Sequence, residues 1–300
     1  MTDRRPAPGD RSVDERLDFG VVNLDKPAGP SAHQVSAWAR DAAGVDRAAH
    51  AGTLDPKVTG CLPILLGDAT RLAQVFLEGT KEYVAVLELH GPAPADLDAV
   101  VSTFEGEIFQ KPPRKSAVTR RLRSRTIHEL DVLEVRDRQA LLRIRCESGT
   151  YVRKLCHDLG LAAGTGAHMG DLRRTATDPF DDTDLVSTAD LTDALAFAAD
   201  GDEAPLRAAV APAERALTHL PHLTVAASAA DQIAEGAPVY APGVVDVDDA
   251  VASAASGADG SEPPLVVCAT PDGTAVCLGR LVGDPFAERG TVVSLERVLV

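Results

Sequence analysis

The sequence predicts a two-domain α/β protein in which a mixed sheet with packed helices is followed by a small β-barrel. A chain of 300 residues is longer than one compact core usually needs, and its 45% of apolar residues can fill two cores. In the first two thirds of the chain, strand-like and helix-like segments interleave without a regular βαβ rhythm, which favours a mixed sheet. After Pro212, short alternating runs are separated by Gly and Pro, which is typical of a small barrel or sandwich.

The expected strands of the first domain are short runs with strand-like alternation. FGVVNLDK at 19–26 leads into a Pro/Gly turn, and KEYVAVLELH at 81–90 is a second run. In a third run, QALLRIRCES at 139–148, the alternation directs four residues toward a core, namely Ala140, Leu142, Ile144 and Cys146. Arg143 and Arg145 then lie on the opposite face of the expected sheet.

Two segments have the apolar spacing of amphipathic helices. In SAHQVSAWARDAAG the spacing i, i+3, i+4 and i+7 defines one apolar face, which Gly44 closes and which consists of Val35, Trp38, Ala39 and Ala42. In TYVRKLCHDLGLAAG helical spacing joins Val152, Leu155, Cys156 and Leu159. We expect both helices to pack on the sheet through these faces.

The C-terminal part, from about His219, contains five short alternating runs, namely HLTV, APVYAPGVV, PLVVCAT, TAVCLGRLV and GTVVSLERVLV. We expect them to supply the strands of the barrel. The acidic insert at 246–262 has too few large apolar residues to fold alone, so we expect a solvated loop there.

Composition excludes several classes of protein. No apolar run reaches 18 residues and the first 16 residues lack the hydrophobic stretch of a secretory signal, so we expect a cytoplasmic protein without membrane contact. The five cysteines form no C-x-x-C pair, and we interpret them as small apolar residues. His and Cys residues show no ligand spacing, so no metal site is expected.

The net charge of −15 is distributed unevenly along the chain. Residues 1–170 carry 23 basic and 23 acidic side chains, whereas residues 171–262 carry 4 and 18, so the N-terminal part keeps its basic patches. Only 6 of the 30 basic residues are lysine, which together with the acidic composition supports the hypothesis of a halophilic protein in a salt-rich cytoplasm. Stability that does not fall at low KCl would contradict this hypothesis.

The densest cluster of chemically active residues is HAGTLDPKVTG at 50–60. Its glycines and its proline indicate a fixed loop, in which Asp55 lies between Leu54 and Pro56. A carboxylate on a rigid loop beside apolar, desolvating neighbours suits nucleophilic or general-base chemistry. The alternative is that Asp55 only caps a turn, and the local sequence by itself favours that alternative.

Further motifs favour the catalytic interpretation of Asp55 over the turn cap. LDKPAGPSAHQV, followed by HAGTLDPKVTGCLPILLGDATRL, resembles the two leading motifs of the TruB-type pseudouridine synthases, in which the Asp of G-T-L-D-P is catalytic. KEYV, CESGTYVRKLCHDLG and GAHMGDLRRTATDPF match in the same order, so the resemblance covers residues 19–180. KPPRKSAVTRRLRSRTIHELDVLE and CESGTYVRKLCHDLG are similar to the dyskerin branch of archaea and eukaryotes, the box H/ACA pseudouridine synthases.

The resemblance implies a fold, an activity and a set of site residues. The fold is a mixed, largely antiparallel sheet of the pseudouridine synthase type, and the isomerisation includes no redox step, so no cofactor is expected. By correspondence Asp55 is catalytic, Tyr83 stacks on the extruded base and Arg153 pairs with the catalytic carboxylate. The remaining pocket residues are Tyr151, Leu172 and His50, the last of which positions RNA.

Each of these assignments has a structural alternative. Tyr83 can be an ordinary buried strand residue, Arg153 can be a helix-surface arginine, and Tyr151 and Leu172 can belong to the core. For Asp55 three chemical roles stay open, namely attack on the ribose carbon, addition to the pyrimidine ring, and removal of a proton.

A basic segment at 111–125, KPPRKSAVTRRLRSR, contains seven basic residues and no acidic residue. Such a run is usually a solvated face, but its presence in an otherwise acidic protein favours contact with RNA phosphates. The residues that we assign to RNA binding are Lys111, Arg114, Lys115, Arg120, Arg121, Arg123 and Arg125.

The C-terminal runs resemble a PUA domain through SAADQIAEGAPVYAPGVV and TAVCLGRLV. In the family this barrel binds guide RNA and an N-terminal tail packs on it, so we expect residues 1–16 beside it. The expected domains are a catalytic domain at 17–212 and a PUA-like RNA-binding domain at 217–300. The insert at 246–262 departs from the compact family form, and TDPF at 177–180 departs from the usual G-P-F.

The implied substrate is uridine in ribosomal RNA, selected by a box H/ACA guide RNA, with the other H/ACA core proteins as partners. The nearest rival is a stand-alone pseudouridine synthase that acts on the T-loop of tRNA without a guide. A non-catalytic RNA-binding scaffold is disfavoured because the full set of pocket residues is present. A glycoside hydrolase is disfavoured because the sequence offers no second carboxylate.

Overall fold

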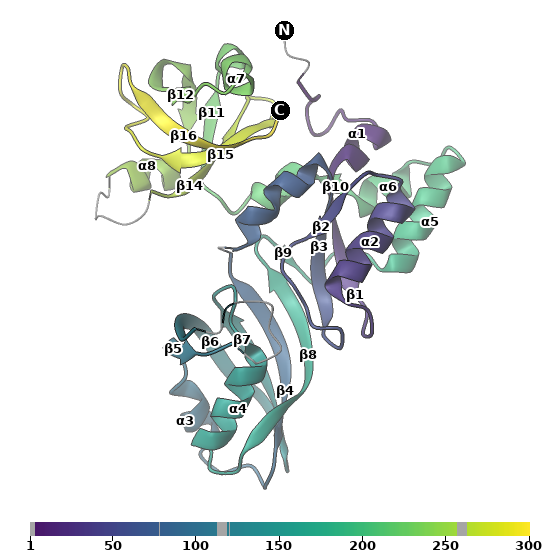
Figure 1. The fold of residues 1–300 in the computed structure, drawn as a ribbon, viewed down its shortest axis with the longest axis vertical. Coiled ribbons are helices and arrows are strands. Elements are labelled where there is room, and N and C mark those ends of the chain that lie inside the picture. The colour runs from purple at the N-terminus through teal and green to yellow at the C-terminus, as the bar shows by residue number, and fades with distance from the viewer. Residues whose placement is uncertain (1–3, 78, 113–118, 120, 257–262) are drawn as a thin grey trace.

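The computed structural model describes residues 4–77, 79–112, 119, 121–256 and 263–300, and these residues form two mixed sheets with associated helices (Figure 1). The strands of the larger sheet are β1 (Phe19–Lys26), β2 (Ala48–His50), β3 (Thr59–Gly67), β4 (Lys81–Leu89), β5 (Gly106–Gln110), β6 (Arg123–Arg136), β7 (Gln139–Cys146), β8 (Ala167–Thr177), β9 (Phe180–Asp181) and β10 (Ala211–Pro212). Their order is β10-β1-β3-β8-β4-β7-β6-β5, with β2 paired to β3 and β9 to β8. The expected mixed, largely antiparallel sheet is confirmed, because β3 and β8 are parallel and the other pairs of this sheet are antiparallel.

Helices cover both halves of this sheet. The helical elements of this part are α1 (Val13–Asp18), α2 (Ala32–Ala43), η1 (Asp68–Leu77), α3 (Leu97–Ser102), α4 (Val152–Ala162), α5 (Thr188–Ala199), α6 (Ala204–Ala209) and η2 (Ala213–Leu217). In Figure 1, α2, α5 and α6 lie beside the half that contains β1 and β3, whereas α3 and α4 lie beside the half that contains β4 to β7. One buried apolar cluster joins α2, α4 and α5 to β1, β3, β4 and β7, so a single core runs across both halves.

The two halves of the sheet meet at a narrow joint between β3 and β8. Only two residue pairs are in parallel register there, Thr59 with Arg173 and Gly60 with Arg174. Gly60 has a φ of 98°, and a Cβ at this position would overlap the backbone carbonyl of Arg174. A glycine is therefore required for this close approach. The joint places the loop that precedes β3 in the middle of the sheet.

The expected core faces of β7 and α4 are confirmed. The four alternate residues of β7, from Ala140 to Cys146, are buried, while Arg143 and Arg145 are exposed. In α4, buried positions include all four residues that the helical spacing selects, namely Val152, Leu155, Cys156 and Leu159.

The expected apolar face of α2 is wrong for two of its four residues. The buried residues are Ala32, Val35, Ser36 and Ala39, whereas Trp38 is 51% exposed and Ala42 is exposed as well. The helix is turned so that two small residues face the sheet and the bulky indole does not. Ser36 tolerates this position because its hydroxyl donates to the Ala32 carbonyl at 3.0 Å, so no polar atom is left unpaired.

All five cysteines are free and buried, as expected for small apolar residues. Burial raises the pKa of the Cys61, Cys146 and Cys156 thiols from 9.0 to about 12. In the unfolded chain these thiols lose their protons near pH 9, whereas the folded protein retains them. The stability that they contribute is therefore fully present below pH 9 and is lost as pH rises toward 12.

We expect the free energy of unfolding to fall between pH 8.5 and 10.5 by at most about 1.4 kcal/mol per pH unit for each thiol. Urea unfolding at fixed KCl measures this slope. A triple variant with Ala at 61, 146 and 156 is the control and should show a shallower slope, because it lacks the three titrations. Equal slopes for both proteins would contradict the expectation.

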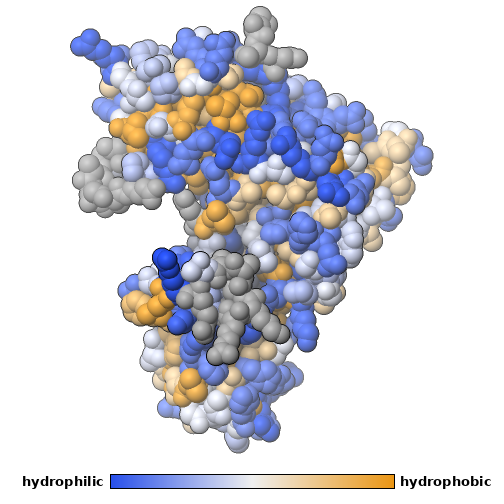
Figure 2. All heavy atoms as spheres, viewed as in Figure 1, coloured by the Kyte–Doolittle hydropathy of each residue, from blue (hydrophilic) through white to orange (hydrophobic). Residues whose placement is uncertain are grey.

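The C-terminal domain is built on a second, six-stranded sheet. Its elements are β11 (His222–Val225), α7 (Ala227–Ala234), β12 (Val239–Tyr240), η3 (Ala241–Gly243), β13 (Val244–Val247), α8 (Asp249–Ser256), β14 (Leu265–Ala269), β15 (Ala275–Leu281) and β16 (Thr291–Val298). The strand order is β12-β16-β15-β14-β11-β13, and each of the five expected runs contributes at least one strand. Figure 2 shows an orange, hydrophobic patch over this domain, together with smaller hydrophobic areas over the rest of the viewed face.

Residues 246–256 of the insert differ from the solvated loop that the composition suggests, and residues 257–262 lie outside the described residues. The insert begins within β13 and continues into the helix α8. Asp248 caps this helix, because its Oδ1 accepts from the Val251 N–H at 2.7 Å, while its Oδ2 accepts from the His222 N–H at 2.6 Å. Val251 is fully buried in the core of the C-terminal domain, so one apolar residue and a cap are enough to order the start of the insert.

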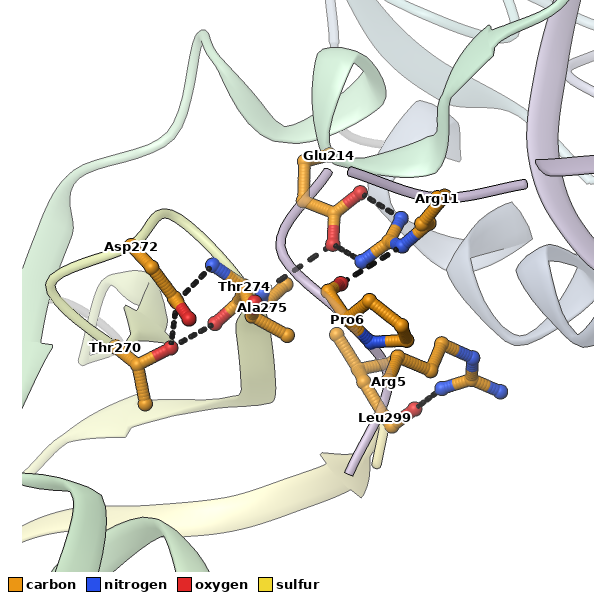
Figure 3. Close-up of polar contacts among 9 residues, drawn as sticks. All are labelled: Arg5, Pro6, Arg11, Glu214, Thr270, Asp272, Thr274, Ala275 and Leu299. Atoms are coloured by element: carbon orange, nitrogen blue, oxygen red, sulfur yellow. Dashed lines mark hydrogen bonds and ion pairs between the residues drawn. The ribbon is translucent and has the colours of Figure 1, made fainter. Parts of the chain in front are cut away.

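The two domains share an apolar interface on the other face of β1 and β3. One buried cluster combines Phe19 and Leu65 of these strands with residues of η1 and η2, and with Val267 and Leu278 of the C-terminal sheet. The described part of the N-terminal tail borders this interface: Arg4 pairs with Asp231 at 3.3 Å, and Arg5 donates to the Leu299 carbonyl (Figure 3). Among the described residues, no helix is both long and apolar enough to cross a membrane.

Candidate active site

The loop that carries Asp55 lies between β2 and β3, directly before the joint of the sheet. Its apolar neighbours Leu54 and Val58 are 4% and 3% exposed and belong to the main core. The Val58 N–H donates to the Asp55 carbonyl at 3.0 Å, which closes a tight turn. The loop is therefore anchored on both sides of the carboxylate, as the glycines and the proline indicated.

The buried Lys26 fixes this loop through hydrogen bonds to backbone carbonyls. The ammonium of Lys26, at the end of β1, donates to the carbonyls of Pro27, Pro56 and Val58 at 2.9, 3.0 and 2.8 Å. Three acceptors match the three donors of an ammonium, which compensates for its burial. Burial lowers the pKa of this lysine below its usual value. Lys26 has no predicted role from the sequence, although a lysine that ends an apolar strand is a usable signal.

Asp55 forms an ion pair with Arg153, which lies in the first turn of α4. Asp55 lies on the loop before β3 and Arg153 lies on α4, so the pair connects the two halves of the sheet. Both side chains are about half exposed, 52% for Asp55 and 51% for Arg153. The protein alone therefore does not provide the desolvation that the sequence suggested, and an exposed pair of this kind contributes little to stability. Its physical effect is to orient the carboxylate.

Tyr83 lies on β4 and is only 9% exposed. It stands opposite Arg174 of β8, which is 1% exposed. Burial raises the pKa of Tyr83, and the nearby Arg174 charge partly offsets this effect. Arg174 Nε donates to the Cys61 carbonyl at 2.7 Å, so this buried cation is joined to β3. Sequence reasoning missed Arg174.

Apolar residues pack against the flanks of the Asp55 loop. Leu172 of β8 is 8% exposed and lies opposite Ala85, two residues along β4 from Tyr83. Leu172 and Tyr83 share a buried cluster with the flanks of the Asp55 loop and with Val152, the first residue of α4. Tyr151 directly precedes this helix and is partly buried. The structure therefore joins Arg153 to Asp55 directly and places Tyr83 and Leu172 in the same apolar core as the flanks of the Asp55 loop, while the pocket role of Tyr83, Tyr151 and Leu172 stays a prediction.

His50 ends β2 and is paired in register with Ile64 of β3. Its Nδ1 is buried and has no hydrogen-bond partner among the described residues. Burial lowers the pKa of His50, and the charges of Arg174 and His33 lower it further, so the imidazole is neutral at pH 7. His50 precedes the Asp55 loop in the sequence, and its role in positioning RNA stays a prediction.

The basic segment is described only in part, because Arg114, Lys115 and Arg120 lie outside the described residues. Lys111 and Arg121 are exposed, whereas Arg123 is partly buried and donates to the Thr119 carbonyl at 3.2 Å. Arg125 is 20% exposed and pairs with Glu147 at 3.1 Å, so its charge is already engaged within the protein.

Changing Arg120, Arg121 and Arg123 together to Ala is expected to weaken RNA binding and to flatten its salt dependence. Each lost phosphate contact lowers the slope of log K against log salt by about 1. Binding titrations across a KCl series measure both quantities. Alanine at Arg136 and Arg138, at the turn between β6 and β7, is the control and should leave them unchanged. Unchanged affinity and slope in the triple variant would remove this segment from the RNA-binding surface.

Within the described part of the chain, no group of three or more His, Cys, Asp or Glu side chains is arranged to hold a metal ion. The chemistry of the pocket is that of one carboxylate, one guanidinium and two tyrosines beside an apolar wall. Such a set can receive a flat base, orient it and act on it with the carboxylate.

Family models match four consecutive parts of the chain. "DKCLD (NUC011) domain" matches residues 6–36, "TruB family pseudouridylate synthase (N terminal domain)" matches 40–96 and 91–152, "tRNA pseudouridylate synthase B C-terminal domain" matches 153–218, and "PUA domain" matches 221–299. These matches define the class of the protein, which is a pseudouridine synthase that carries a C-terminal PUA domain.

Curated relatives agree with this class. Proteins called probable tRNA pseudouridine synthase B are 66% identical in Haloarcula marismortui, over 100% of this chain and 94% of the relative, and 66% identical in Halobacterium salinarum, over 99% of each. A relative of the same name in Methanopyrus kandleri is 45% identical over 98% of this chain and 86% of its own length. The chain therefore belongs to the TruB family of pseudouridylate synthases. The two haloarchaeal relatives fit the acidic, halophilic composition.

Solved structures of Cbf5 complexes have the same fold. The structure titled "Crystal Structure of a Cbf5-Nop10-Gar1 Complex" is 40% identical with a TM-score of 0.91, over 100% of this chain and 91% of that chain. A box H/ACA ribonucleoprotein "bound to a substrate RNA containing 2'-deoxyuridine" is 38% identical with a TM-score of 0.89, over 100% and 91% of the two chains. The expected likeness to the dyskerin type is thus confirmed.

Proposed function

We propose that this chain is the catalytic subunit of a box H/ACA ribonucleoprotein that converts uridine to pseudouridine in ribosomal RNA, with Asp55 as the catalytic residue. The observation that carries the proposal is the ion pair of Asp55 and Arg153, on a loop whose flanks share a buried cluster with Tyr83 and Leu172. The likeness to a Cbf5-Nop10-Gar1 complex and to a chain of an H/ACA RNP bound to a substrate RNA, over the whole of this chain, supports the choice of substrate and partners.

The reaction breaks the bond between N1 of the base and C1′ of ribose, turns the base and joins C5 to C1′, while the proton of C5 is lost and N1 gains one. The pocket must therefore admit a base that has left its stack. In this proposal Tyr83 stacks on the ring, Leu172 and Tyr151 line the pocket, and Arg153 orients the Asp55 carboxylate toward the nucleoside. The bound base supplies the desolvation that the free protein lacks, since both members of the pair are exposed without it.

The domains have separate roles in this proposal. Residues 17–212 form the catalytic domain, and residues 217–300 form the PUA-like domain that binds guide RNA, with the tail of residues 1–16 beside it. The basic segment at 111–125 contacts phosphates of the substrate. The other H/ACA core proteins complete the particle, and the cytoplasm is its location, because the enzyme acts where its RNA substrates are.

A second candidate substrate is the T-loop of tRNA, modified without a guide. The names of the curated relatives favour it, as does the match of residues 153–218 to the C-terminal domain of tRNA pseudouridylate synthase B. A purely structural RNA-binding role is disfavoured, because such a role needs no oriented carboxylate.

The test compares two substrates under two conditions. Purified protein is incubated with a tRNA transcript and with a ribosomal RNA fragment, each with and without guide RNA and the core partner proteins, and pseudouridine is mapped at single-nucleotide resolution. Guide-dependent modification of the ribosomal fragment is the expected result. Modification of the tRNA alone, unaffected by guide and partners, would replace the proposed function by the tRNA alternative.

A further inference from the structure

A buried glutamine joins the basic segment to the pocket. Gln110 is the last residue of β5, lies directly before the segment and is 1% exposed. Its Oε1 accepts a hydrogen bond from the Tyr151 N–H at 2.9 Å, and its Nε2 donates to the Tyr151 carbonyl at 3.3 Å. One side chain therefore holds both backbone polar groups of a pocket residue.

The position of Tyr151 explains why an outside partner is needed. Tyr151 precedes the first residue of α4, and the N–H of such a residue has no acceptor within the helix. A neutral amide supplies an acceptor and a donor at once, which neither a carboxylate nor an ammonium does. Gln110 thus sets the place where α4 begins.

The other end of the basic segment is fastened to the same turn. Glu147 pairs with Arg125 at 3.1 Å, and its Oε2 accepts from the Thr126 N–H at 3.0 Å. The Glu147 N–H donates in turn to the Thr126 carbonyl at 2.9 Å. Gly149 has a φ of 80°, and a Cβ there would lie 3.2 Å from an Arg125 nitrogen, so the turn packs closely on this guanidinium. Both ends of the segment therefore meet the turn of residues 147–151.

This turn leads directly to the catalytic pair. Arg153 follows Tyr151 by two residues and contacts Asp55, whose loop Lys26 holds from the other half of the sheet. The Asp55 side of the pair is thus fixed independently of the basic segment. The Arg153 side depends on how firmly Gln110 and Glu147 hold the start of α4.

We propose that Gln110 is a positioning residue for the isomerisation, which transmits RNA contact at the described residues Arg121 and Arg123 to Tyr151 and Arg153. The proposal rests on the proposed function, in which the segment binds substrate and Asp55 reacts. Gln110 touches neither the base nor the carboxylate, and acts through the backbone of Tyr151 alone.

The test replaces Gln110 by methionine, which keeps the length and burial of the side chain and removes both hydrogen bonds. With enzyme in saturating excess over RNA, the single-turnover rate of pseudouridine formation is expected to fall roughly 10- to 100-fold, the effect of a displacement of catalytic groups by about 1 Å. The Kd for RNA is expected to change by less than about threefold, because the phosphate-binding side chains are retained. Gln139→Met is the matched control: this exposed glutamine, which donates to Glu88 at 2.8 Å, should be replaceable without loss of rate.

Further measurements separate positioning from a general loss of structure. Rates are compared at a KCl concentration and temperature where the near-UV circular dichroism of the variant equals that of the wild type. If Gln110→Met does not reach that signal, Gln110→Asn is used instead, which retains the amide one methylene short and should give an intermediate rate. A structural role alone predicts the wild-type rate once folding is restored, and that result would overturn the proposal.

A double-variant cycle tests the link to the basic segment. In a background with Ala at Arg121 and Arg123, Gln110→Met is expected to lower the rate by a clearly smaller factor than in the wild type. Strictly multiplicative effects would also overturn the proposal. The proposed function fails in a different way, namely when the wild type forms no pseudouridine or when a variant without the Asp55 carboxylate forms it at the wild-type rate.

Discussion

Asp55→Asn is expected to lower the single-turnover rate of pseudouridine formation by roughly 10⁴-fold or more, the size of effect seen when a group that acts directly on substrate is removed. Asparagine has the same shape and can still accept a hydrogen bond from Arg153, so the loop should keep its place. What is lost is the negative charge and the ability to attack or to take a proton. The three chemical roles open to Asp55 all require the carboxylate, so the expectation does not depend on the choice among them.

Asp55→Asn is expected to retain RNA binding. Measuring the Kd together with the rate therefore separates a loss of catalysis from a loss of binding. The Asp55 carboxylate faces RNA as an anion, so its removal should leave the Kd unchanged or lower it. Asp41→Asn on α2 is the control, because Asp41 is 64% exposed and pairs with its neighbour Arg40 outside the pocket. If the rate of Asp55→Asn were within tenfold of the wild-type rate, Asp55 would not be the catalytic residue and the proposed mechanism would be wrong.

Elements with strong periodicity were predictable because local packing alone determines them. In β7 the alternation of Ala140, Leu142 and Ile144 with two arginines leaves one choice of buried face, and the structure adopts it. In α2 the choice was less constrained, because the large side chain at Trp38 competes with the small ones at Ala32 and Ser36. In the structure the small residues Ala32 and Ser36 are buried against the sheet and Trp38 is exposed. The local spacing of apolar residues does not predict this choice of buried face.

The residues that hold the site in place were not predictable for a different reason. Lys26, Gln110 and Arg174 are polar residues that burial would normally exclude, and each is tolerated only because its partners arrive from distant parts of the chain. A sequence pattern identifies the groups that act on substrate, since their types follow from the chemistry. It does not identify the groups that satisfy backbone carbonyls and amides after folding.

The N-terminal tail supplies another buried polar contact, at the junction of the domains. Arg11 is fully buried and donates to both oxygens of Glu214, in η2, at 2.7 and 2.6 Å, and its Nε donates to the Pro6 carbonyl at 3.1 Å (Figure 3). Glu214 also accepts from the Ala275 N–H, at the start of β15, at 3.3 Å. A single carboxylate therefore connects the tail, the segment between the domains and the C-terminal sheet.

Arg11→Met is expected to lower the free energy of unfolding by about 3–5 kcal/mol, because it leaves the carboxylate of Glu214 buried without its cation. Adding Glu214→Gln removes that charge and retains an acceptor for Ala275, so the double variant should recover more than half of the loss. Urea unfolding at fixed KCl measures both values, and Arg40→Met, which breaks an exposed pair, should change little. If the double variant were no more stable than Arg11→Met, the uncompensated charge would not be the cause. The loss would then come from the other contacts of Arg11, namely its hydrogen bond to the Pro6 carbonyl and its guanidinium 5.4 Å from the centroid of the Phe19 ring, and the bidentate pair would serve only to orient the tail.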